Sequence, residues 1–184
     1  MMIQPRLDFY PTYIIDTCCV MELDNAHRVL KGQDPPPPRY TNAERAAVWE
    51  GLERLAKDGR LKIIRFVKEE LADHYPAILP RLDSLPHTGC NITNRVRLAY
   101  QELIGRNPKV LEGWPHDPAH DDADPWIVAF AKTSGFTVIT EEISAEQSSR
   151  KKRKKGMSIP DLCDAEGVKC VKLRRLATDE GWLS

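Results

Sequence analysis

The sequence lacks the features that mark membrane-bound and disulfide-rich proteins. No hydrophobic run approaches the length of a membrane span, and no basic segment followed by a long apolar stretch opens the chain. The five cysteines are odd in number and include no Cys-x-x-Cys pair, which argues against a disulfide framework and against a structural zinc site. We therefore expect a reducing, cytoplasmic setting and no membrane partner.

The sequence also lacks a net charge. Its 27 Lys and Arg residues balance 27 Asp and Glu residues, so the overall charge does not indicate a nucleic-acid partner. The basic residues are nevertheless clustered in one run, which consists of Arg150, Lys151, Lys152, Arg153, Lys154 and Lys155. Such a run fits a surface that binds phosphate groups, and it fits a solvated loop equally well.

The length and composition are those of a single globular domain. The 184 residues are 41% hydrophobic and 29% charged, which is enough apolar material for one core. We assign residues 1–184 to one domain, with a proline-rich insertion near 31–40 and a basic loop near 147–157. The four consecutive prolines Pro35–Pro38 exclude a helix and favour a stiff polyproline II spacer.

Short β-branched runs alternate with segments of helical spacing along the chain. The expected strands are Tyr13–Asp16, Leu61–Ile64, Phe136–Thr140 and Val168–Leu173, and the expected helices are Thr41–Asp58, a short one from Val67, Thr93–Ile104, Asp124–Gly135 and Ile159–Ala165. We assign no element to Tyr75–Leu85, which contains two prolines. Strands that alternate with helices form a parallel sheet with right-handed crossovers. The sequence thus predicts a three-layer α/β/α fold with a central parallel sheet.

Acidic residues stand at or near the ends of three of these strands. Asp16 and the pair Glu141–Glu142 follow strands directly, and Glu70 comes about one helical turn after another. Asp124 begins a helix, and in a βα layout that position faces the same edge of the sheet. Carboxylates that meet there repel one another unless a cation compensates, and a cluster of oxygen ligands suits Mg²⁺ or Mn²⁺ better than zinc.

Each acid also has a purely structural explanation. Asp124 before Pro125 has the form of a helix N-cap. Glu69 and Glu70 can complement a helix dipole, and Glu141–Glu142 can be plain loop charges. The joint placement of acids at one edge favours a site over these separate explanations.

The same residues resemble the motifs of the PIN-domain ribonucleases, the fold used by VapC-like toxins of bacterial toxin–antitoxin pairs. The resemblance covers most of the chain and has four parts: Tyr13–Thr17, a hydrophobic run ending in Asp-Thr; Val67–Leu71, with a Glu before Leu; Asp124–Ala131, where an Asp starts a helix; and Thr137–Glu142, a strand followed by Thr-x-acid. A narrower likeness to a PIN-like group of uncharacterised bacterial proteins rests on Trp49, Gly59–Leu61 and Ile159–Cys163.

The resemblance implies a PIN-like fold and an endoribonuclease that uses Mg²⁺ or Mn²⁺ to hydrolyse RNA phosphodiesters, as the toxin of a toxin–antitoxin pair. The metal ligands and catalytic residues that it implies are Asp16, Glu70, Asp124 and Glu142. Motif register alone selects Glu70 over Glu69 and Glu142 over Glu141. The fourth acid is a Glu where the family more often has Asp, and Cys18 stands where Ser, Thr or Asn is common.

Supporting roles follow from the same resemblance. Thr17 and Thr140 would orient a carboxylate or a water through their hydroxyl groups. The basic run at 150–155 would bind RNA phosphates or face an acidic antitoxin segment. RNA, a small cognate antitoxin protein and a second copy of the chain are the implied partners.

Three other interpretations remain open at this point. A non-catalytic member of the fold would bind RNA or protein without cleaving it. A haloacid-dehalogenase-type phosphatase also begins with a strand ending in Asp, but it needs a second Asp where this chain has Cys18. The segment His116–Asp122 contains His and Asp at spacings that suit zinc or iron, although a polar loop before a capped helix explains the same residues.

Overall fold

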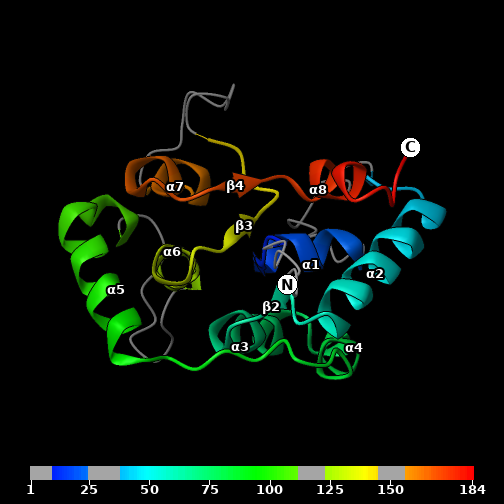
Figure 1. Ribbon diagram of the computed structural model, residues 1–184, viewed down its shortest axis with the longest axis horizontal. Coiled ribbons are helices and arrows are strands. Elements are labelled where there is room, and N and C mark those ends of the chain that lie inside the picture. The colour runs from blue at the N-terminus through cyan, green and yellow to red at the C-terminus, as the bar shows by residue number, and fades with distance from the viewer. Residues whose placement is uncertain (1–9, 25–37, 112–122, 145–155) are drawn as a thin grey trace, which may run out of the picture.

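A computed structural model of the chain has a parallel sheet at its centre (Figure 1). The structure describes residues 10–24, 38–111, 123–144 and 156–184. Its strands lie in the order β2-β1-β3-β4, and every neighbouring pair is parallel. Their bounds are Tyr13–Ile15 for β1, Leu61–Lys62 for β2, Thr137–Ile139 for β3 and Cys170–Val171 for β4.

Helices cover both faces of this sheet. Their bounds are Thr17–Leu23 for α1, Asn42–Lys57 for α2, Arg65–His74 for α3, Leu79–Asp83 for α4, Asn94–Arg106 for α5, Ala123–Ser134 for α6, Ile159–Glu166 for α7 and Leu173–Asp179 for α8, with short 3₁₀ helices at Pro76–Ile78 (η1) and Pro108–Leu111 (η2). In Figure 1, α5, α6 and α7 lie on one side of the sheet, while α1, α2 and α8 lie on the other. The predicted three-layer α/β/α architecture with a parallel sheet is confirmed.

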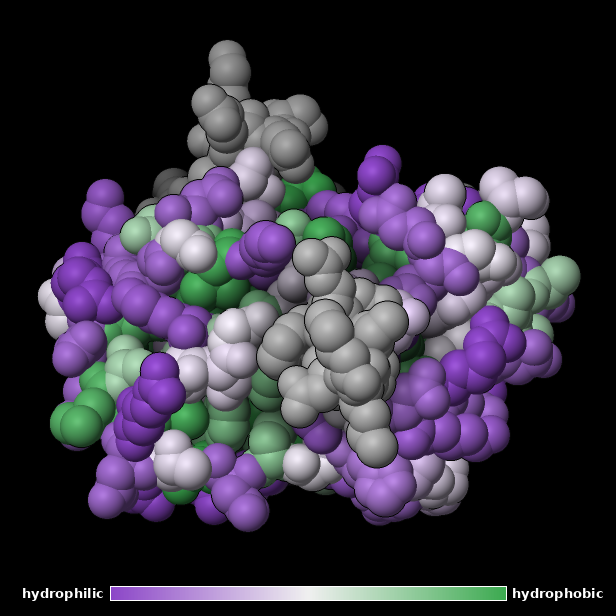
Figure 2. All heavy atoms as spheres, in the orientation of Figure 1, coloured by the Kyte–Doolittle hydropathy of each residue, from purple (hydrophilic) through white to green (hydrophobic). Residues whose placement is uncertain are grey.

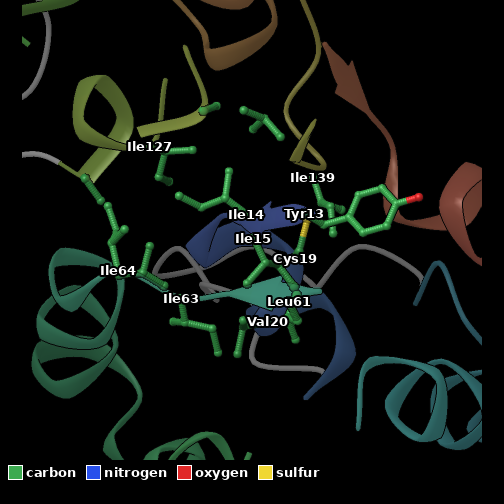
Figure 3. Close-up of a cluster of buried hydrophobic side chains, with 14 of the residues drawn as sticks. Tyr13, Ile14, Ile15, Cys19, Val20, Leu61, Ile63, Ile64, Ile127 and Ile139 are labelled. Atoms are coloured by element: carbon green, nitrogen blue, oxygen red, sulfur yellow. The ribbon is translucent and has the colours of Figure 1, made fainter. Parts of the chain in front are cut away.

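The two central strands are buried on both faces. Ile14, Ile15 and Ile139 are almost completely inaccessible to solvent. Figure 3 shows Ile14 on the side of Ile127 from α6 and Ile15 on the side of Val20 from α1. Burial on both faces is why β1 and β3 are continuous apolar runs rather than alternating ones. A polar side chain at the end of such a strand must therefore lie at the edge of the sheet, where the apolar layers stop.

The outer surface shows no sign of a membrane span. Within the described ranges, no helix is both long enough and apolar enough to cross a bilayer. Figure 2 shows one face of the molecule, covered mostly by hydrophilic side chains with hydrophobic ones scattered between them.

Two helices were not predicted from the sequence. The first, α1, contains Thr, Cys and Val, which are poor helix formers, and it is held by the burial of Cys19, Val20 and Leu23. The second, α8, was assigned in part to the last strand, because Leu173 continues the apolar run of β4. Its burial of Leu173, Leu176 and Ala177 has helical spacing, but seven residues are too few for a clear period.

Several element boundaries also differ from the prediction. β2 ends at Lys62 because the N–H of Ile63 donates to the carbonyl oxygen of Thr88, at 2.9 Å, and so leaves the sheet. α3 then begins at Arg65, two residues before the predicted start. The unassigned segment from Tyr75 forms η1 and α4, and each of these has a proline in its first turn, where a missing N–H costs nothing.

Candidate functional site

Asp16 lies where the sequence predicted it, directly after β1. Its backbone N–H donates to the carbonyl oxygen of Ile139 at 3.0 Å, which extends the pairing of β1 with β3 by one residue. The residue is 3% exposed and occupies the N-cap position of α1. Its side chain makes no capping hydrogen bond. Stopping a strand or capping a helix therefore does not account for this buried carboxylate.

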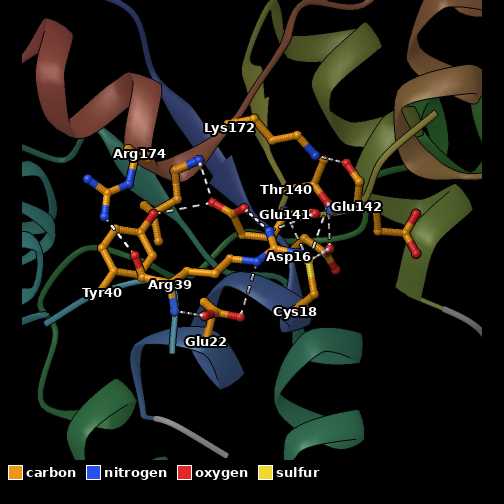
Figure 4. Close-up of polar contacts among 11 residues, drawn as sticks. Asp16, Cys18, Glu22, Arg39, Tyr40, Thr140, Glu141, Glu142, Lys172 and Arg174 are labelled. Atoms are coloured by element: carbon orange, nitrogen blue, oxygen red, sulfur yellow. Dashed lines mark hydrogen bonds and ion pairs between the residues drawn. The ribbon is translucent and has the colours of Figure 1, made fainter. Parts of the chain in front are cut away.

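The carboxylate of Asp16 points instead toward the end of β3 (Figure 4). The hydroxyl of Thr140 donates to Oδ2 at 2.8 Å, and the thiol of Cys18 donates to the same oxygen at 2.6 Å. Cys18 also accepts the backbone N–H of Glu141 at 3.1 Å. Within the described residues, no hydrogen bond reaches the other oxygen, Oδ1. Asp16 thus has one oxygen fixed by two donors and the other without one.

The ionisation of Asp16 reflects its crowded surroundings. Burial raises its pKa to about 7, and the negative charges of Glu142 and Glu70 raise it further. The hydrogen bonds from Cys18 and Thr140 act in the opposite direction, because they stabilise the charged form. Burial also raises the pKa of Cys18, so its thiol stays protonated and able to donate. The acids at this edge are therefore close enough to repel one another.

Glu70 joins α3 to the starts of two other helices. The hydroxyl of Thr17 donates to its Oε2 at 2.6 Å, and the backbone N–H of Ala123 donates to its Oε1 at 3.0 Å. Ala123 is the first residue of α6, so Glu70 supplies a partner for an N–H that the helix itself leaves unpaired. Glu69 is exposed on the other side of α3. Of these two glutamates, Glu70 is the one at the sheet edge.

Glu142 and Glu141 each accept a hydrogen bond from the start of a different helix. The N–H of Ile159, the first residue of α7, donates to Oε2 of Glu142 at 2.8 Å. The N–H of Leu173, the first residue of α8, donates to Oε1 of Glu141 at 3.1 Å. Helix N-termini carry partial positive charge, which stabilises carboxylates placed against them. Several helices that start at one edge thus make an acidic cluster tolerable there.

Glu141 is further neutralised by cationic and phenolic neighbours. The guanidinium of Arg39 forms an ion pair with its Oε2 at 2.5 Å, and the hydroxyl of Tyr40 donates to Oε1 at 3.3 Å. Glu142, not Glu141, is the acid whose charge raises the pKa of Asp16. The geometry therefore separates the two: Glu141 belongs to a salt-bridge network with Arg39, and Glu142 belongs with Asp16.

Asp124 is the second residue of α6 and is partly buried. The helix already includes Ala123, so Asp124 is part of its first turn, and the N-cap explanation of Asp124 does not hold. Its neighbour Ala123 is the residue bound by Glu70. Asp124 contributes to the raised pKa of Cys163 in α7, which places its charge toward that helix. It does not figure among the charges that raise the pKa of Asp16.

The comparisons with known proteins bear on this arrangement. A family described as "Domain of unknown function (DUF4411)" matches residues 37–183, which is most of the chain. The chain belongs to the DUF4411 family. No curated protein matches it. The DUF4411 match includes Glu70, Asp124 and Glu142, and it begins after β1 and α1, so Asp16 and Thr17 lie before it.

The side chains at this edge do not form a ready-made metal cage. Among the described residues, no group of three or more His, Cys, Asp or Glu side chains stands close enough to hold an ion. The donor chemistry is nevertheless that of a hard-cation site, since Asp16, Glu70 and Glu142 supply only carboxylate oxygens. A carboxylate has about four lone-pair positions, so an oxygen that accepts a backbone N–H can still bind a cation.

Two basic residues at this edge were missed in the sequence. The ammonium of Lys172 donates to the backbone carbonyl of Glu142, and Arg39 reaches Glu141 from the segment before α2. Lys172 directly follows β4, so the rule that strand ends share an edge, applied to cations as well as acids, would have found it. Arg39 adjoins the proline-rich tract, and nothing in the sequence links it to a residue 102 positions later.

Some predicted features lie outside the described residues. These are the basic run at 150–155, the segment His116–Asp122 and most of the proline-rich insertion. Asp161, interpreted from the sequence as a capping residue, lies in the first turn of α7. Ser158 is the cap, because its hydroxyl accepts the N–H of Asp161 and donates to the Asp161 carboxylate at 2.6 Å.

Proposed function

We propose that this DUF4411 chain is a metal-dependent ribonuclease of PIN-like type. The observation that carries the proposal is the state of Asp16: it is buried at the carboxyl end of β1 and raised in pKa to about 7 by burial and by two neighbouring acids. A divalent cation bound there would offset the repulsion among these carboxylates. Perturbed acids at the strand-end edge of an α/β sheet are also a common property of functional sites.

The residues would divide the work as follows. Asp16, Glu70, Asp124 and Glu142 would hold Mg²⁺ or Mn²⁺ through carboxylate oxygens. When bound, the metal would lower the pKa of a water that attacks the phosphodiester. Thr140 fixes Oδ2 of Asp16 through its hydroxyl, which leaves Oδ1 for the ion. Thr17 fixes Oε2 of Glu70 in the same way at the start of α1.

The test is RNA cleavage by the purified protein with Mg²⁺, with Mn²⁺ and with EDTA. We expect cleavage with either metal and none in EDTA, and we expect the Asp16→Asn variant to lose it. Glu70→Gln and Glu69→Gln form a matched pair on α3, because only Glu70 contacts Thr17 and Ala123. Loss of activity in Glu70→Gln with retention in Glu69→Gln supports the proposal. Equal cleavage by all these samples would refute the metal mechanism.

A toxin role and its partners belong to the same proposal. The RNA substrate, the phosphate-binding role of residues 150–155, a small antitoxin and a homodimer all rest on the family resemblance and the sequence. Induced expression should arrest growth, Asp16→Asn should relieve the arrest, and coexpression of an adjacent small reading frame should do the same. Growth arrest that persists in the Asp16→Asn variant would separate toxicity from cleavage.

A non-catalytic RNA- or protein-binding module is the second candidate. The observation that favours it is that Glu70, Glu141 and Glu142 already accept hydrogen bonds from the first N–H groups of α6, α8 and α7. Acids with that structural use need no metal. In this case RNA binding, measured by fluorescence anisotropy, would be indifferent to EDTA, and the Asp16→Asn variant would bind as the parent does.

A further inference from the structure

A second cluster of reactive side chains lies beside the acidic site and is not used by it. Cys163 is completely buried in α7, and Cys170 is partly buried in β4, where it packs against the same core. Since β4 is the last strand in the order β2-β1-β3-β4, Cys170 stands on an edge strand. One thiol is therefore sheltered and the other lies nearer to solvent.

The chain reversal between α7 and β4 brings these two cysteines together. The backbone N–H of Val168 donates to the carbonyl oxygen of Cys163 at 2.8 Å, and Gly167 provides the left-handed conformation, with φ of 67°, that ends α7. Cys170 follows two residues after Val168. The side chains meet there, because the thiol of Cys163 donates a hydrogen bond to the sulfur of Cys170.

This contact makes the two sulfurs chemically different. The hydrogen bond from Cys163 lowers the pKa of Cys170, and the positive charge of Lys172 lowers it further, against the effect of burial. The pKa of Cys163 is raised by the same hydrogen bond and by burial. Thiolate, not thiol, is the nucleophile in sulfur chemistry. Cys170 is thus suited to react first and Cys163 to resolve the product.

We propose that Cys163 and Cys170 are an oxidation site of this protein and form a reversible intrachain disulfide. With a peroxide as oxidant, the Cys170 thiolate attacks one peroxide oxygen, the O–O bond breaks, and protonation of the leaving hydroxide gives water and a sulfenic acid. The sulfur of Cys163 then attacks the sulfenic sulfur, forms the S–S bond and releases a second water after giving up its proton. In total, two thiols and one hydrogen peroxide give one disulfide and two waters.

The other cysteines are less suited to such a bond. Cys18 and Cys19 are consecutive residues of α1, and neighbouring side chains on a helix point in different directions. The thiol of Cys18 is also engaged with Asp16. Burial raises the pKa of Cys90, and no second thiol contributes to its shift. The pair in α7 and β4 is therefore the one that the geometry selects.

The bond would lie between the two attachments of Glu142. The N–H of Ile159, at the start of α7, binds the Glu142 carboxylate, and Lys172, two residues after Cys170, binds its backbone carbonyl. A disulfide from α7 to β4 would thus tie together both elements that position this glutamate.

The test is a peptide map and uses no RNA, so its result is independent of the proposed ribonuclease. The intact protein is treated with hydrogen peroxide, its remaining thiols are alkylated in denaturant, and it is digested with trypsin. Cleavage after Lys155, Lys169 and Lys172 separates Cys163 from Cys170, so the disulfide links the peptide 156–169 to the peptide 170–172. We expect this linked pair, short of two hydrogen atoms, and its disappearance after treatment with dithiothreitol.

Variants make the result decisive. Cys170→Ser should abolish the linked peptides, and Cys90→Ser should leave them unchanged. Circular dichroism establishes that Cys170→Ser is folded, and Cys163→Ala serves as the second variant if it is not. The proposal is overturned if peroxide leaves both thiols free to react with the alkylating agent. It is also overturned if either forms a link with Cys18, Cys19 or Cys90, or if Cys170 is carried to sulfinic acid while Cys163 remains a thiol.

Discussion

The hydroxyl of Thr140 donates a 2.8 Å hydrogen bond to Oδ2 of Asp16 and so joins the ends of β3 and β1. Both residues are buried, and the contact spans 124 positions of the sequence. Because the carboxylate has few other donors, this bond does much to keep a buried charge tolerable. The ionisation of Asp16 should therefore respond to changes at Thr140.

Replacement of Thr140 by valine should raise the pKa of Asp16. Valine has nearly the same shape and lacks the hydroxyl that stabilises the ionised form. We also expect a loss of stability of about 1 kcal/mol, the usual net value of one hydrogen bond. An NMR titration of the Asp16 carboxyl carbon measures the pKa, and urea unfolding measures the free energy. Thr178→Val, at an exposed position of α8, is the control; an equal shift of the Asp16 pKa in both variants would contradict the assignment.

Stability should decrease as the pH rises from about 4 to about 7. The pKa of Asp16 is about 7 in the folded protein and about 4 in an unfolded chain, so the folded state binds more protons between these values. The contribution of Asp16 is complete below the unfolded pKa and is lost as the pH passes through the folded one. Its size is on the order of a few kcal/mol. Urea unfolding across this range, in EDTA, measures the slope.

The Asp16→Asn variant is the control for this pH dependence. It removes the titrating group with little change of shape, so it should flatten the slope and be more stable than the parent at pH values above the folded pKa. If the variant keeps the parent's pH profile between these limits, Asp16 is not the group responsible.

The position of Asp16 could be predicted because it depends only on local sequence. A β-branched run that stops at a carboxylate indicates a strand end, and parallel topology brings strand ends to one edge. The alternation of strands and helices gave the sheet and its layers for the same reason. Short helices such as α1 were missed, because seven residues held by tertiary packing carry little periodic signal.

The partners of the acids could not be predicted, because they depend on tertiary contacts. Glu141 and Glu142 are adjacent in sequence, yet one pairs with Arg39 and the other with the first N–H of α7. Similarly, nothing in the sequence around Glu70 indicates that it binds the start of α6. Motif register chose Glu70 and Glu142, and the structure places both at the edge with Asp16. Whether they bind metal stays a prediction.

Addition of Mg²⁺ or Mn²⁺ should stabilise the protein at a pH above the folded pKa of Asp16. A ligand that binds only the folded state adds about 2.7 kcal/mol when its concentration is a hundred times its dissociation constant. We therefore expect the melting temperature to rise with metal concentration, and we expect Asp16→Asn to abolish the rise. The Glu69→Gln variant, altered at an exposed position, should behave as the parent does. A melting temperature that is indifferent to both metals would argue for the non-catalytic module.

Replacement of Gly51 by alanine should destabilise the fold, although Gly51 lies within α2 and alanine favours helix. A Cβ at this position would stand 2.1 Å from Cδ2 of Trp182, so the indole would have to leave its place against the helix. Overpacking of this kind costs about 1–3 kcal/mol. Gly105 in α5 has open space around it, and Gly105→Ala should be neutral or stabilising by up to about 1 kcal/mol. Urea unfolding of both variants, with Gly51→Ala repeated in a Trp182→Ala background, measures the clash: its cost should largely disappear when the indole is absent, and a cost that is unchanged there would place its origin elsewhere.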